Sequence, residues 1–83
     1  MSNDETIAGE IIRLAEARGA AASFCPSEVA RALSPEWRPL LGAVRRQAAL
    51  LAAAGRIDIL RKGKPVPAAE MRGVIRLRLR GGA

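Results

Sequence analysis

The part of the chain that decides the fold reads WRPLLGAVRRQAALLAAAG (37–55), RIDILRK (56–62), GKPVPAAEMRG (63–73) and VIRLRLR (74–80). The spacing of its apolar residues changes at Gly55 from about 3.6 residues, typical of a helix, to about two, typical of a strand. A long helix followed directly by two strands and a basic, Pro/Gly-rich loop is the recognition-helix-and-wing half of a winged helix. We therefore predict an α+β fold of this type, a winged helix-turn-helix.

The helix in this stretch is expected to run from Arg38 or Pro39 to Ala54. Pro39 fits only the first turn, because deeper in a helix it would remove a hydrogen bond and clash. Gly55 is the residue type that commonly ends helices. The predicted core face comprises Leu40, Val44, Ala48 and Leu51, with Leu51 fully buried and Leu41 beside it. The opposite face carries Gly42, Arg45, Arg46, Ala49 and Ala53.

Two strands are predicted after this helix. Residues 56–62 alternate around Ile57 and Ile59. Residues 62–73 are expected to form one wing loop that is mobile at its tip, because about ten residues are too many for a tight hairpin turn. In the last strand Ile75, Leu77 and Leu79 alternate with Arg76, Arg78 and Arg80. This pattern predicts a half-buried strand with an arginine ridge on its solvent face.

The residues before Trp37 predict two more helices. The first spans about 4–18, with Ser2 or Asn3 as its cap and Gly19 after its end. Residues 20–24 are expected to form a brief strand, with Phe24 in the core. The second helix is PSEVARAL (26–33), with Cys25 as N-cap. Residues 1–83 are then one domain of three helices and a two- or three-stranded antiparallel sheet.

The composition indicates a small soluble protein. A chain of 83 residues, 49% of them apolar, can bury one core. Its single cysteine excludes an internal disulfide and fits a reducing compartment. The polar, acidic N-terminal residues have no features of a signal peptide, and no apolar run is long enough to span a bilayer. We expect a cytoplasmic protein without a membrane partner.

Positive charge is concentrated in the second half of the chain. Residues 37–83 hold eleven Lys and Arg against Asp58 and Glu70, a net charge of +9, whereas residues 1–36 carry −3. The whole chain has a net charge of +6 and a pI near 11.3. Such a balance favours polyanionic partners, among them nucleic acids.

Four segments resemble an uncharacterised bacterial family known as a domain of unknown function. They are CPSEVARAL (25–33), WRPLLGAVRRQAALLAAAGRI (37–57), KGKPV (62–66) and RGVIRLRL (72–79), and the resemblance covers about residues 23–80. The sequence departs from the family where Val66-Pro67-Ala68 replaces Val-Asp-Pro, and where Val74 replaces a proline. The resemblance implies a winged-helix fold and no particular activity.

Catalysis has no support in the sequence, and we expect neither an enzyme nor a cofactor. The chain has no histidine, no cysteine pair, no phosphate-loop glycine pattern and no metal-ligand cluster. Cys25 has two interpretations. A thiol at a helix N-terminus can be activated, or it can be a small inert residue. The inert interpretation is favoured, because a nucleophilic cysteine normally needs a neighbouring base. No small-molecule substrate is evident.

Double-stranded DNA is the partner that the charge pattern favours. The predicted nucleic-acid-binding residues are Arg45, Arg46, Gln47, Lys62, Lys64, Arg72, Arg76 and Arg78. Arginine and lysine neutralise phosphates, and arginine can also read guanine. The small residues of the long helix offer little else for base contacts, so phosphate contacts should dominate.

Two alternatives stay open at this stage. Gly42, Ala49 and Ala53 would let another helix approach closely, which would make the domain a protein-interaction or dimerisation module. The arginines of the last strand could also be an ordinary solvated face. Trp37 is expected to pack against the core or the turn.

Overall fold

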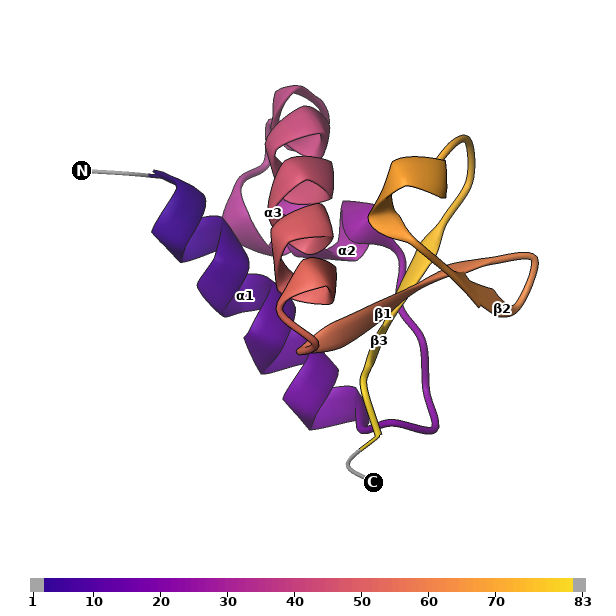
Figure 1. The fold of residues 1–83 in the computed structure, drawn as a ribbon. Coiled ribbons are helices and arrows are strands. Elements are labelled where there is room, and N and C mark those ends of the chain that lie inside the picture. The colour runs from indigo at the N-terminus through magenta and orange to yellow at the C-terminus, as the bar shows by residue number, and fades with distance from the viewer. Residues whose placement is uncertain (1–2, 82–83) are drawn as a thin grey trace.

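The computed structural model describes residues 3–81 and contains three α-helices beside a small antiparallel sheet (Figure 1). The elements in chain order are α1 (Asn3–Arg18), α2 (Pro26–Leu33), the 3₁₀ turn η1 (Arg38–Leu40), α3 (Leu41–Ala53), β1 (Ile57–Arg61), β2 (Lys64–Val66), the 3₁₀ turn η2 (Ala68–Glu70) and β3 (Arg76–Leu79). This α+β arrangement has the layout of a winged helix, as predicted.

The helix ends follow local chemistry. Gly19 and Gly55 have φ values of +78° and +80°, the left-handed conformation that suits a glycine after a helix. Pro26 begins α2, and the Cys25 amide before it donates to Glu28 Oε2 at 3.0 Å. Of the predicted caps of α1, Ser2 lies outside the described residues, and Asn3 is the first residue of the helix. The predicted long helix is divided into η1 and α3, with Pro39 in the 3₁₀ turn.

The sheet has the strand order β2-β1-β3, and both pairings are antiparallel. β1 pairs with β3 from Ile57↔Leu79 to Leu60↔Arg76. The expected strand at 20–24 is reduced to one bridge, in which Phe24 and Leu77 exchange two backbone hydrogen bonds of 2.8 and 2.7 Å. The third strand of the sheet is instead β2, which the sequence analysis did not predict.

The prediction of one loop over residues 62–73 was wrong. Lys62 and Gly63 form a two-residue turn between the paired residues Arg61 and Lys64. Both turn residues have positive φ, 53° and 81°, the type I′ geometry that matches the twist of a hairpin. β2 ends at Val66, where Pro67 has no N–H to continue the ladder. The chain then turns through η2, beside α3, before it enters β3 (Figure 1).

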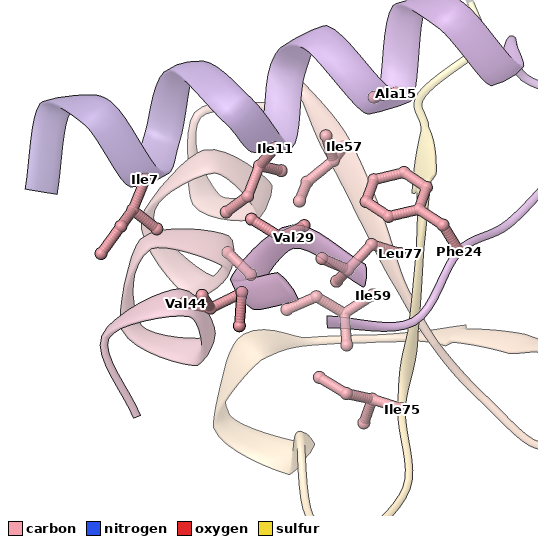
Figure 2. Close-up of a cluster of buried hydrophobic side chains, with 12 residues drawn as sticks. Ile7, Ile11, Ala15, Phe24, Val29, Val44, Ile57, Ile59, Ile75 and Leu77 are labelled. Atoms are coloured by element: carbon pink, nitrogen blue, oxygen red, sulfur yellow. The ribbon is translucent and has the colours of Figure 1, made fainter. Parts of the chain in front are cut away.

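One hydrophobic core lies where the three helices meet the inner face of the sheet (Figure 2). All three helices and two of the strands contribute to it. Its residues are Ile7, Ile11 and Ala15 from α1, Phe24 before α2, Val29 and Ala30 from α2, Val44 and Ala48 from α3, Ile57 and Ile59 from β1, Ile75 before β3 and Leu77 from β3. Leu51 is only partly buried, which corrects the prediction of full burial. Fewer residues of α3 are buried than predicted, and these are Val44 and Ala48. Within residues 3–81, no helix combines the length and apolarity needed to cross a membrane.

Candidate nucleic-acid interface

The outer face of α3 carries one cation, one exposed leucine and small residues. Gly42, Arg46, Leu50 and Ala53 are exposed, while Gln47 is half-buried. The Arg46 side chain lies back over Gly42, with its Nη1 atom 3.6 Å from the position that a Cβ would take. Leu50 is 63% exposed. Leu50 was not predicted to be exposed, because helical spacing alone does not show which apolar residues of a helix lack a neighbour to pack against.

Arg45 is bound to the chain that follows η2. Its Nη2 donates to the Met71 carbonyl at 3.0 Å and its Nη1 to the Gly73 carbonyl at 3.2 Å. The side chain is half-buried there. Two charge-assisted hydrogen bonds to backbone carbonyls make Arg45 a clamp between α3 and the wing. It is therefore less free to contact DNA than the sequence analysis expected.

The basic residues of the wing are exposed. Lys62 and Lys64 lie at the tip of the β1–β2 hairpin, which projects to the side of α3 (Figure 1). Arg61 precedes the turn, and Arg72 lies on the loop held by Arg45. None of these four side chains makes an ion pair or side-chain hydrogen bond with the described part of the chain. They present free positive charge to solvent.

The arginines of β3 and its end make contacts within the protein. Arg78 Nη2 lies 3.2 Å from Asp58 Oδ2, and Arg80 Nε lies 3.0 Å from Asp58 Oδ1. Arg78 sits directly opposite Asp58 in the register of β1 and β3. Arg76 donates to the Ser23 hydroxyl at 2.7 Å and the Ser23 carbonyl at 3.0 Å. The predicted ridge is therefore not a free cationic surface, because one carboxylate serves two of its arginines.

A further pair of cations lies before η1. The guanidinium carbons of Arg31 and Arg38 are 4.5 and 4.6 Å from the centroid of the Trp37 ring. Both arginines are exposed and the tryptophan is half-buried. This cluster was not predicted, and its only signal in the sequence is the adjacent Trp37-Arg38 pair. Trp37 packs against the core, as expected, and also carries the two cations.

The acidic and thiol side chains of the described residues do not gather in one place. Residues 3–81 contain no group of three or more His, Cys, Asp or Glu side chains placed to hold a metal ion. A hollow of about 490 Å³ lies between the end of α3 and the hairpin, with Ala53, Val66, Asp58 and Arg80 in its lining. Its carboxylate is already paired with two arginines. Half-buried Cys25 accepts a hydrogen bond from the Ser27 hydroxyl at 3.1 Å and caps α2.

The model of a family described as "Protein of unknown function (DUF3253)" matches residues 4–80. No curated protein matches the chain.

Proposed function

The chain belongs to this family of proteins of unknown function. We propose that it is a small DNA-binding module. It contacts the sugar–phosphate backbone of a duplex through the outer face of α3 and the wing. The residues in this role are Arg46 on α3, Lys62 and Lys64 at the hairpin tip, and Arg72 on the loop after η2.

This proposal rests on which of the Lys and Arg side chains have no ion pair. Arg46, Lys62, Lys64 and Arg72 are exposed and make no ion pair within the described chain, whereas Arg78 and Arg80 share Asp58. Free positive charge is thus retained on α3 and the wing. Exposed cations of this kind release counterions when they meet phosphates, which supports binding to a polyanion.

Direct base reading has weaker support. Arg46 and half-buried Gln47 are the side chains of α3 with hydrogen-bonding groups on or near its outer face, and the neighbouring Gly42 and Ala53 have none. Arg45, which could have read guanine, is engaged by two wing carbonyls. The proposed module therefore binds duplex DNA with little preference for sequence.

A salt titration tests the proposal. Binding of a fluorescent random-sequence duplex is measured by anisotropy at several salt concentrations, and log K should fall linearly with log salt at about 0.9 per phosphate contact. The double variant Lys62→Ala/Lys64→Ala should reduce the slope by about 1–2. Arg13→Gln/Arg18→Gln removes the same charge from α1 and should leave the slope unchanged. Absence of salt-sensitive binding by the wild type at low ionic strength would refute the proposal.

Self-association is the second candidate function, and exposed Leu50 favours it. Leu50 is 63% exposed between Gly42 and Ala53, which are also exposed and would allow a second helix to approach. Burial of this side chain would be favourable by about 1.5–3 kcal/mol. Sedimentation analysis of the wild type beside Leu50→Lys tests this alternative. A dimer that the substitution converts to a monomer would support it, and a wild-type monomer at high concentration would exclude it.

A further inference from the structure

The Trp37 cluster holds two positive charges at a fixed place. Arg31 comes from the last turn of α2, and Arg38 is the first residue of η1. Both guanidinium groups lie over one indole ring, at 4.5 and 4.6 Å from its centroid. The ring attracts both cations through its quadrupole and so brings together two side chains from different elements.

No carboxylate neutralises this pair within residues 3–81. Neither Arg31 nor Arg38 forms an ion pair with the described part of the chain. Both are exposed. A cation–π contact involves the charge of a guanidinium and not its N–H donors. Those donors therefore stay available to an acceptor that approaches from solvent.

This arrangement suits a phosphate better than a neutral ligand. Each guanidinium carries a full positive charge beside the same ring, so a phosphate that contacts either of them is attracted by both. Arginine forks match phosphate oxygens in geometry. Because the ring already restricts both long side chains, less conformational freedom is lost when the anion binds.

We infer that Arg31 and Arg38, positioned by Trp37, form a second phosphate-binding site for the backbone of a DNA duplex. The inference rests on the proposed function and extends it. The cluster precedes η1 and α3, so it would grip the duplex at the N-terminal end of α3. The hairpin cations lie beyond the other end of α3 in the chain. The duplex would then contact cations that precede α3 and cations that follow it in the chain.

The single tryptophan makes the site directly observable. Trp37 is the only tryptophan in a chain without tyrosine, so its emission reports this cluster alone. A random-sequence duplex is titrated into the wild type, and Trp37 emission is followed beside the anisotropy of the labelled duplex. Binding of phosphate to the guanidinium groups should change the emission, with saturation at the same duplex concentration as the anisotropy.

Variants that each lose one positive charge test whether Arg31 and Arg38 bind phosphate. Arg31→Gln and Arg38→Gln should each reduce the slope of log K against log salt by about 0.9. Arg13→Gln is the control, because Arg13 lies on α1, outside the proposed DNA-binding residues, and is paired with Glu10. It should change neither the slope nor the emission response. Circular dichroism verifies that each variant is folded.

The outcomes separate this inference from the proposed function. Duplex binding with unchanged Trp37 emission, or with wild-type slopes in both arginine variants, would overturn the phosphate site and leave the proposed function standing. Absence of duplex binding by the wild type would overturn both. A matched change in emission and slope supports the site.

Discussion

Replacement of Lys62 by asparagine should stabilise the fold while it weakens DNA binding. Lys62 has a φ of 53°, the left-handed conformation that non-glycine residues rarely adopt. Its exposed side chain makes no ion pair or hydrogen bond with the described part of the chain that would offset this strain. Asparagine tolerates the conformation, and Asn-Gly is the preferred sequence for a type I′ turn.

The expected gain follows from the backbone geometry. The left-handed conformation costs a typical residue about 1–2 kcal/mol, and asparagine relieves part of that cost. We therefore expect Lys62→Asn to raise the free energy of unfolding by about 0.5–1 kcal/mol. For a domain of this size, 1 kcal/mol corresponds to a change of roughly 4–8 °C in Tm. The loss of one cation should at the same time reduce the salt slope of DNA binding by about 0.9.

Thermal melts by circular dichroism and anisotropy titrations measure the two effects. Lys64→Asn is the matched control, because it removes the same charge from β2, where asparagine is a poor strand former. It should lower the salt slope equally without an increase in Tm. A Tm that falls in Lys62→Asn, or that rises equally in both variants, would contradict the turn geometry on which the argument depends.

Three other substitutions test the core, an acid-sensitive contact and the wing. Leu77→Ala should lower the free energy of unfolding by about 2–5 kcal/mol in chemical denaturation, because Leu77 is fully buried; a loss below about 1 kcal/mol would argue against this core. The pKa of the Glu28 carboxyl lies below 4.5, chiefly because the Cys25 amide donates a hydrogen bond to it and secondly because Arg18 does. The ionised carboxylate therefore stabilises the fold fully above pH 4.5, and this stabilisation is lost as the pH falls through the folded-state pKa. The difference in Tm between wild type and Glu28→Gln should accordingly shrink on acidification, and a difference independent of pH would oppose this. Arg45→Ala frees two carbonyls of the wing and should speed amide hydrogen exchange in residues 71–75, which Arg46→Ala should leave unchanged.

Sequence alone determined the elements whose signals are local. The start of α2 follows from Pro26 and the end of α3 from Gly55, because these residues act on the backbone next to them. The alternation of Ile75, Leu77 and Leu79 placed β3 and its buried face. Periodicity of this kind reflects which side of an element meets the core, so it can be read without the partner element.

Tertiary structure decided the features that depend on contacts between distant residues. The Lys62-Gly63 turn forms because β1 pairs with β2, and this pairing holds Lys62 in a conformation that its own preference disfavours. Arg45 became a clamp for the wing because Met71 and Gly73, 26 and 28 residues away in the chain, bring their carbonyls to it. The number of charges can be read from the sequence, but only the packing shows which of them are neutralised. The basic half of the chain could therefore be identified from the sequence. Which arginines are paired could not, because that depends on Asp58, which lies opposite Arg78 across the sheet.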